Sequence, residues 1–259
     1  MKKTIISIAI ILVLLPVASA AEIVERDITY EHAGEKLMGF LAYDSELSGP
    51  LPGVVVVHEW WGLNEHARNS ARRLAELGYA AFALDMYGKG VLAETPEKAA
   101  QLSKPFRDDR AMMCARAGEG LQALRNTGKA DPERIAAIGY CFGGTTVLEM
   151  ARGGLDLQGV VSFHGGLSTP KPAKSISSAV LVLHGADDPH VKPEEAKAFR
   201  KEMRESGADW QMVYFGGAVH SFTNPAAGDD PSRGVAYNED AARRSWKYMK
   251  VFLEEVLKK

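Results

Sequence analysis

Residues Arg134 to Gly144 read RIAAIGYCFGG, and this stretch decides the expected fold. The apolar run from Ile135 to Ile138 predicts a buried strand. The five residues from Gly139 to Gly143 match the G-x-nucleophile-x-G pattern of a sharp turn between a strand and a helix, with cysteine where serine usually stands. Such a turn lifts one side chain above the sheet and points the N-terminus of the next helix at it. The sequence therefore predicts that Cys141 is a nucleophile.

Strands and helices alternate along the rest of the chain. Residues 23–30 and 37–43, with Gly34 in the turn between them, predict an antiparallel pair at the edge of a sheet. Strands separated by helical patterns indicate βαβ units, so we expect an α/β fold with a mostly parallel central sheet flanked by helices. Further strands are expected at residues 54–57, 79–84, 134–138, 159–163, 180–183 and 210–215, and helices at 64–78, 107–124, after Gly143, 194–204 and 239–257.

The segment from residue 86 to residue 106 is expected to be irregular, because it contains Gly88, Gly90, Pro96 and Pro105. Long loops in compact domains are often functional, so this segment is a candidate lid. No repeat, low-complexity tract or domain-sized linker interrupts the sequence, which predicts one domain over residues 21–259.

The first twenty residues have the features of a cleavable secretory signal. Lys2 and Lys3 precede an apolar run from Ile5 to Val17, and Ala18-Ser19-Ala20 provides small residues before a cut after Ala20. A membrane anchor is the alternative, but the apolar run is shorter than the ~20 residues that a transmembrane helix needs. We expect cleavage, a periplasmic or secreted location and no stable membrane insertion of the remaining chain.

The charge of the chain argues against a nucleic-acid-binding protein. Without Lys2 and Lys3, the 31 basic residues fall by two against 33 acidic ones, which leaves a net charge of −4 and no sign of a basic surface. The two cysteines, Cys114 and Cys141, are candidates for a disulfide in an oxidising compartment. Because Cys114 lies in an amphipathic helical run and a bridge would consume the predicted nucleophile, we expect Cys114 to be a buried free thiol.

Candidate partners for the nucleophile follow two other predicted strands. Active sites of open α/β sheets lie beyond the carboxyl ends of the strands. The neighbouring acids Asp187 and Asp188 follow one late strand, and His220 follows the next. Nucleophile, acid and histidine thus occur in the chain order of the α/β-hydrolase triad. The spacing leaves open whether Asp187 or Asp188 is the acid.

The expected chemistry explains these residue types. A free thiol has a pKa near ~8.5, so little thiolate exists at neutral pH. A histidine within hydrogen-bond reach takes the proton as the thiol attacks a carbonyl, and a carboxylate behind it fixes its tautomer. The tetrahedral oxyanion needs two donors, for which we expect the backbone N–H groups of Phe142 and Trp60. This chemistry requires no cofactor.

A metal site is the alternative interpretation for His58, His66, Asp187 and His190. His58 and His66 do not have the i, i+4 spacing of a zinc-binding helix, so no metal is expected. His164 lies at a predicted strand end, where a structural hydrogen bond is the expected role.

Five segments of the chain resemble the dienelactone hydrolase family, whose fold is an α/β-hydrolase and whose nucleophile is cysteine. They span nearly the whole chain after the predicted signal, and their combination is specific although no single segment is. The resemblance implies that the triad acid is Asp188. The segments are His58-Glu59-Trp60-Trp61-Gly62-Leu63-Asn64, Asp85-Met86-Tyr87-Gly88, Gly139-Tyr140-Cys141-Phe142-Gly143-Gly144, His184-Gly185-Ala186-Asp187-Asp188-Pro189 and Gly217-Ala218-Val219-His220-Ser221-Phe222.

The resemblance also implies a role for Glu59, because family enzymes hold a carboxylate there that takes the thiol proton once substrate displaces it. A buried ion pair or a hydrogen bond to the loop is the alternative for Glu59. The best-known members bind a substrate carboxylate with basic side chains, and Lys89 is a candidate for one of them. The position four residues after His220, basic in those enzymes, is Asn224 here. This departure favours a broader ester or lactone activity over dienelactone itself.

Aromatic residues near these motifs are candidates to line an apolar substrate pocket, namely Trp60, Trp61, Tyr87 and Phe222, although core packing is equally expected for Trp61. We therefore expect a monomeric hydrolase that cleaves a small-molecule ester or lactone. One alternative is a non-catalytic protein of the cell envelope that binds a ligand on the same fold. A redox thiol is a weaker alternative, because no resolving cysteine lies nearby in the sequence.

Overall fold

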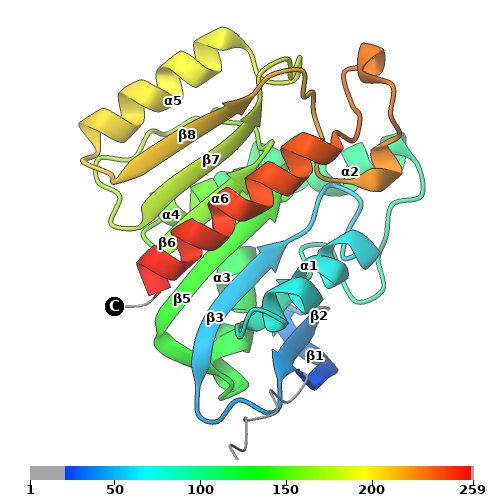
Figure 1. Ribbon diagram of the computed structural model, residues 1–259, viewed down its shortest axis with the longest axis vertical. Coiled ribbons are helices and arrows are strands. Elements are labelled where there is room, and N and C mark those ends of the chain that lie inside the picture. The colour runs from blue at the N-terminus through cyan, green and yellow to red at the C-terminus, as the bar shows by residue number, and fades with distance from the viewer. Residues whose placement is uncertain (1–20, 258–259) are drawn as a thin grey trace, which may run out of the picture.

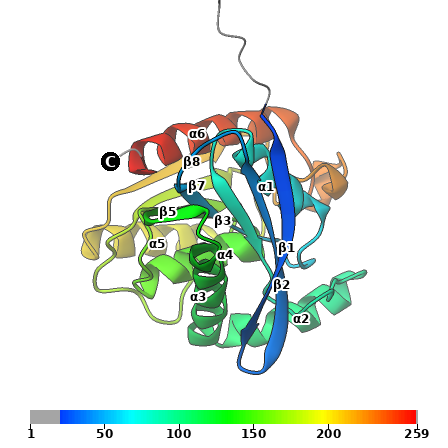
Figure 2. The same cartoon turned by 90° about the horizontal axis from the view of Figure 1, so that it is seen from below.

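An eight-stranded sheet runs through the protein, with helices on both of its faces (Figure 1, Figure 2). The computed structural model describes residues 21–257, so the predicted signal at residues 1–20 lies outside the described residues and stays a prediction. The strand order is β1-β2-β4-β3-β5-β6-β7-β8. Strand β2 is antiparallel to β1 and β4, and the other neighbours are parallel. The expected α/β fold, with an antiparallel pair at its N-terminal edge, is confirmed.

The elements follow the expected alternation. The strands are β1 (Ile23–His32), β2 (Glu35–Asp44), β3 (Leu51–Val57), β4 (Ala80–Leu84), β5 (Ala130–Tyr140), β6 (Gly159–Phe163), β7 (Ala179–Gly185) and β8 (Trp210–Phe215). The helices are α1 (Glu65–Ala75), α2 (Pro96–Asp108), α3 (Arg110–Asn126), α4 (Phe142–Arg152), α5 (Pro193–Glu205) and α6 (Glu239–Leu257), with short 3-10 turns η1 (Pro225–Ala227) and η2 (Pro231–Arg233).

Strand β3 shows why the central strands are continuous apolar runs. Val54 and Val56 point into the core layer beneath α1 and α6, whereas Val55 and Val57 point into the layer beneath α3 and α4. All four side chains are fully buried. Because successive residues of a strand face opposite sides, a strand covered on both faces needs apolar residues at every position. Each such valine contributes about 1.5–3 kcal/mol of burial free energy.

The winding of the sheet determines where the site lies. Strand β4 pairs with one side of β3 and β5 pairs with the other side, so the direction of winding reverses at β3. Ligands of open α/β sheets bind in the crevice outside the carboxyl ends of the strands at such a reversal. The loop that begins at His58 and the turn at Cys141 follow β3 and β5, and they meet at this crevice.

The prediction that residues 86–106 are irregular is wrong for the second half of this segment, which forms α2. Thr95 caps this helix by accepting the Lys98 N–H at 3.3 Å, and Pro96 stands in the first turn, where its missing N–H has no helical acceptor. Pro105 lies inside the last turn. Asp109 ends α2 and caps the next helix, so α3 begins at Arg110 rather than at residue 107. Reading both prolines as breakers caused the error.

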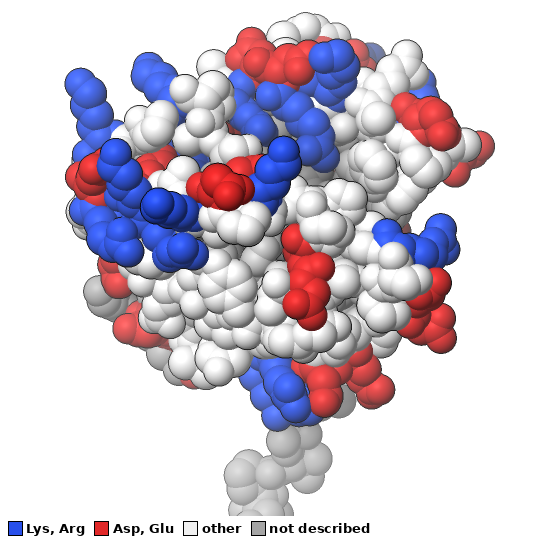
Figure 3. Space-filling model, turned by 90° about the horizontal axis from the view of Figure 1, so that it is seen from above, with Lys and Arg blue, Asp and Glu red and all other residues white. Residues whose placement is uncertain are grey.

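The two cysteines are free, and Cys114 is half-buried rather than buried. Its Sγ lies against Gly153 at the end of α4, where a Cβ would be 2.5 Å from the sulfur. Among residues 21–257, no helix is long and apolar enough to cross a membrane. Acidic and basic side chains are both present on the face shown in Figure 3, together with large uncharged areas.

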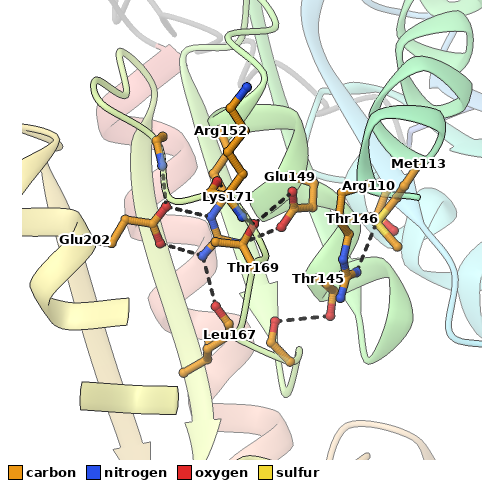
Figure 4. Close-up of polar contacts among 12 residues, drawn as sticks. Arg110, Met113, Thr145, Thr146, Glu149, Arg152, Leu167, Thr169, Lys171 and Glu202 are labelled. Carbon is orange, nitrogen blue, oxygen red and sulfur yellow. Dashed lines mark hydrogen bonds and ion pairs between the residues drawn. The ribbon is translucent and has the colours of Figure 1, made fainter. Parts of the chain in front are cut away.

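A buried cluster of charges holds α4 against the loop that follows β6 (Figure 4). The Arg152 guanidinium binds both carboxylate oxygens of Glu202, at 3.0 and 2.8 Å, and Glu149 at 2.8 Å. The same guanidinium donates to the Leu167 carbonyl at 2.9 Å, and Glu202 accepts the Ala173 N–H at 2.9 Å. The side chains of Arg152 and Glu202 are each only 4% exposed. This cluster therefore ties α4, which directly follows Cys141, to the loop after β6.

We predict that Arg152→Met destabilises the fold strongly, because it leaves Glu149 and Glu202 as buried carboxylates without a cation. Breaking a buried ion pair in this way costs about 3–5 kcal/mol. Lys104→Met is the matched control, since the Lys104–Asp108 pair is exposed and worth at most about 1 kcal/mol. Urea unfolding of both variants measures the difference, and equal losses would contradict a structural role for the cluster.

Candidate active site

The turn at Cys141 is possible only because small residues surround it. Cys141 adopts φ 52° and ψ −111°, in the left-handed half of the map where side chains are strained. A Cβ on Gly139 would collide with the Gly143 carbonyl, and a Cβ on Gly143 would collide with the carbonyl of Val57. The two glycines of the pattern therefore allow α4 to start directly against the end of β3, with Cys141 raised at the top of the sheet.

A continuous hydrogen-bonded chain joins Cys141, His220 and Asp188. His220 Nε2 lies 3.0 Å from Cys141 Sγ, and His220 Nδ1 lies 2.9 Å from Asp188 Oδ2. The other oxygen of Asp188 accepts the backbone N–H of His190 at 2.8 Å. Asp187 is exposed and accepts the Gly217 N–H instead. Of the two acids that the sequence left open, Asp188 is the one that bonds His220.

The charges in this chain favour a protonated imidazole. Burial opposes the charged form of His220, but the negative charge on the Cys141 sulfur and the hydrogen bonds to Asp188 and Cys141 outweigh it and raise the pKa of His220 well above 6.5. Burial also opposes the charged form of Asp188, yet its bond to His220 and the charge of that ring lower the pKa of Asp188 below 3.8. The arrangement favours an imidazolium form of His220 between Cys141 and Asp188.

The backbone N–H groups of Phe142 and Trp60, two residues that line a cavity together with Cys141, are candidate oxyanion donors. Phe142 is the first residue of α4, so its N–H has no acceptor within the helix. The loop that carries Trp60 is held from behind, because the Tyr87 hydroxyl donates to the Trp60 carbonyl at 3.0 Å. His58 Nδ1 donates to the Glu59 carbonyl at 2.5 Å, while His58 Nε2 accepts the Met86 N–H at 3.2 Å. His58 thus has a structural role between two loops.

Glu59 is buried behind the cavity wall, with an exposed fraction of 2%. Its carboxylate accepts the Ser221 hydroxyl at 2.9 Å and the Asn224 side-chain amide at 2.5 Å. Asn224, which departs from the basic residue expected by resemblance, is therefore a neutral partner of Glu59. No hydrogen bond joins Glu59 to Cys141 within the described part of the chain, since the thiol is paired with His220.

His164 supports the backbone of Cys141, as expected for a structural histidine. Its Nδ1 accepts the Cys141 N–H at 3.2 Å, which places its proton on Nε2, and Nε2 donates to the Thr223 hydroxyl at 2.8 Å. Burial and the neighbouring His220 lower the pKa of His164 well below 6.5, so the ring stays neutral. His164 itself has a positive φ of 39°.

A cavity of about 730 Å³ opens above Cys141 and His220. Of the predicted pocket residues, Trp60 and Trp61 line it. Lys89, Tyr87 and Phe222 do not: Lys89 is exposed beyond the loop, Tyr87 points at the Trp60 carbonyl, and Phe222 is fully buried against His164. The other lining residues are Asn64, Leu92, Ala93, Arg107, Phe142, Thr145, Gly166, His190, Val191, Ser221, Asn224, Ala226, Ala227 and Val235.

Several polar residues of this cavity could not be predicted from the sequence, among them Arg107 and His190. Arg107 was assigned to the start of a helix, and its place at the end of α2 became visible only with that helix. His190 was considered only as a metal ligand, although its position two residues after Asp188 placed it at the same strand end. Within residues 21–257, no group of three or more His, Cys, Asp or Glu side chains is arranged to hold a metal ion.

Comparison with known proteins identifies the family. Residues 37–257 match the family model described as "Dienelactone hydrolase family". The chain belongs to the dienelactone hydrolase family. This membership confirms the resemblance seen in the sequence and makes the chain a hydrolase.

Individual relatives within and near the dienelactone hydrolase family agree with the fold. A dienelactone hydrolase-like promiscuous phosphotriesterase from metagenomic libraries is 43% identical, with a TM-score of 0.86 over 90% of this chain and 98% of its own. A Klebsiella pneumoniae structure, provisionally titled a dienelactone hydrolase, is 25% identical with a TM-score of 0.76 over 90% and 98%. A Saccharolobus solfataricus protein, provisionally named a carboxymethylenebutenolidase, is 27% identical over 90% of this chain and 100% of its own.

We predict that His220 keeps its proton well above pH 6.5 and that Asp188→Asn lowers its midpoint. The sign follows from the raised pKa, since a neutral amide stabilises the imidazolium less than the carboxylate does. NMR titration of the His220 ring measures both midpoints. Asp187→Asn, which alters an acid that bonds only the loop backbone, is expected to leave the midpoint unchanged. Equal midpoints in wild type and Asp188→Asn would contradict the prediction.

Proposed function

We propose that this member of the dienelactone hydrolase family cleaves a small ester or lactone with Cys141 as nucleophile, His220 as base and acid, and Asp188 as the orienting carboxylate. The observation that carries the proposal is the chain of contacts from sulfur to imidazole to carboxylate at 3.0 and 2.9 Å, which opens into the cavity. The strained backbone of Cys141 also supports the proposal, because strain of this kind clusters at active sites. Glycines on both sides of the turn allow this conformation.

The first half-reaction forms a thioester. The Cys141 thiolate attacks the carbonyl carbon, and the carbonyl electron pair moves to an oxyanion stabilised by the N–H groups of Phe142 and Trp60. The carbonyl re-forms as the carbon–oxygen bond to the alcohol breaks, and His220 Nε2 gives its proton to that oxygen. In the second half-reaction His220 takes a proton from water, the resulting hydroxide attacks the thioester, and the thiolate leaves beside the imidazolium.

Glu59 has a different role in this scheme from the one implied by resemblance. To take the thiol proton it would have to give up its bonds to Ser221 and Asn224, both of which line the cavity. Those two bonds support a holding role, in which the buried carboxylate fixes the segment that follows His220.

The cavity supports a substrate with a sizeable apolar part and an anionic group. Trp60, Trp61 and Leu92 supply apolar wall, and Arg107 supplies a guanidinium with no acidic partner within 4 Å among the described residues. Arg107 bonds only the Ser103 hydroxyl and lies over the Phe142 ring. Hydrolysis of a phosphotriester is a second candidate, favoured by the 43% identity to a promiscuous phosphotriesterase that covers 90% of this chain.

We predict that Cys141→Ala lowers kcat/KM for esters and lactones by about 10³-fold or more, because the covalent route is lost. Cys114→Ala is the matched control, since it removes the other thiol away from the cavity. Purified protein is assayed against a panel of p-nitrophenyl esters, lactones and one p-nitrophenyl phosphotriester. Full ester turnover by Cys141→Ala would overturn the proposal, and turnover of none of the panel by wild type would favour the ligand-binding alternative.

We predict that Arg107→Met raises KM about 3- to 10-fold for an ester whose acyl part ends in a carboxylate, and leaves KM for the neutral methyl analogue within two-fold. An exposed charge contact is worth about 1 kcal/mol, which corresponds to this range. Lys89→Met is the control, because Lys89 lies outside the cavity. Steady-state kinetics on the two substrates measure both KM values. A larger increase of KM in Lys89→Met than in Arg107→Met would show that Lys89, and not Arg107, binds the carboxylate.

A further inference from the structure

The residues that line the cavity come from two sides of the sheet. Cys141 lies between these two sides, because it follows the central strand β5. Strands β3 and β4 lie on one side of β5, and β6, β7 and β8 lie on the other. The loops after β3 and β4 bring the first group of lining residues, and the loops after β7 and β8 bring the second. The first group includes Trp60, Trp61, Leu92 and Ala93, and the second includes His190, Val191, His220 and Val235.

Under the proposed function, on which this inference rests, the two sides of the cavity contact different parts of the substrate. The oxyanion of the adduct faces the N–H groups of Phe142 and Trp60, on the side of β3. The leaving oxygen needs the proton on His220 Nε2, which reaches the sulfur from the side of β8. The alcohol part of the substrate therefore lies beside the residues that surround His220.

His190 is placed to meet that alcohol. Its ring centroid lies 4.9 Å from that of His220, with an angle of 67° between the rings, and both residues are connected to Asp188. Pro189 before it packs closely on Gly234, where a Cβ would lie 2.7 Å from the proline ring, so the position of the segment is fixed. Within the described part of the chain, no residue hydrogen-bonds the ring nitrogens of His190.

The neutral form of the His190 ring can act as a hydrogen-bond donor. His190 is exposed at the rim of the cavity; its partial burial and the positive charge of His220 lower its pKa, against an opposing effect of Asp188. A neutral imidazole has one N–H donor and one acceptor. Val191 and Val235 provide apolar wall on the same side, and Val235 lies beside His220 through a backbone bridge.

We infer that His190 donates a hydrogen bond to the oxygen of the leaving alcohol, and that Val191 and Val235 contact the carbon chain of that alcohol. In this step the carbon–oxygen bond breaks and its electron pair stays on the oxygen. The proton comes from His220 Nε2, while His190 keeps its own proton and stabilises the negative charge that develops before the transfer. His190 and the two valines thereby determine which alcohols the enzyme releases.

The test varies the leaving group at a constant acyl group. Esters of p-nitrophenol, phenol, trifluoroethanol and butanol are compared by kcat/KM, which reports the steps up to release of the alcohol. A hydrogen bond to developing charge matters most for poor leaving groups. We expect His190→Phe to reduce kcat/KM about 10-fold for the butyl ester and less than two-fold for the p-nitrophenyl ester. We expect His190→Gln, which keeps an N–H donor, to recover most of the loss.

Leu92→Ala is the matched control on the other side of the cavity. We expect it to change the preference for acyl chain length and to leave the dependence on the leaving group unchanged. Equal losses for all leaving groups in His190→Phe, or a loss that His190→Gln does not relieve, would overturn the inference while Cys141 dependence is retained. Ester hydrolysis that persists in Cys141→Ala would instead overturn the proposed function, so the two failures are distinguishable.

Discussion

The close approach of α4 to the end of β3 is the constraint on which the site depends. Gly143 lies so near the Val57 carbonyl that no side chain fits there, and Gly139 lies equally near the carbonyl of Gly143. At this approach Cys141 has a positive φ, and Phe142 directly after it is the first residue of α4. A strained residue persists only where its surroundings determine it, and here paired strands on both sides of β5 do so.

Two groups of charged side chains lie near this turn, one on each side of α4. Behind α4, Arg152 is compensated fully by Glu149 and Glu202, and the cluster is closed to solvent. In front of α4, the imidazole of His220 faces a thiol that can carry the opposite charge, and Asp188 stabilises it. The first arrangement fixes a loop, whereas the second can change its protonation during a reaction. A helix that is held rigidly at its far end keeps the geometry at its near end within the narrow range that acyl transfer requires.

The sequence predicted the sheet, and it placed His220 and the neighbouring acids Asp187 and Asp188 beside the thiol, because their signals are local and short. Apolar runs mark buried strands, and side chains directly after those strands must meet at one edge. The residues of the cavity wall were harder to predict, because most of them lie in loops and helices, where no short sequence signal shows which side chains face the cavity. Arg107 reached the cavity through a helix that starts and ends with proline-containing turns, and Lys89 and Phe222 point away although their motifs lie at the strand ends. Side-chain direction there depends on loop contacts, such as the Ala93 N–H bound to the Trp61 carbonyl.

Under the proposed function, the cavity walls are separate from the residues that carry the reaction. The reaction proposed above uses Cys141, His220, Asp188 and two N–H groups, which lie beyond the carboxyl ends of the strands. In the same proposal, the loops after β3 and β4 contact the acyl part of the substrate, and those after β7 and β8 contact the alcohol part. Because these two sets of loops lie on opposite sides of β5, residues of one set can change without altering the other set. Specificity for the acid part and for the alcohol part of an ester can therefore change independently in this fold.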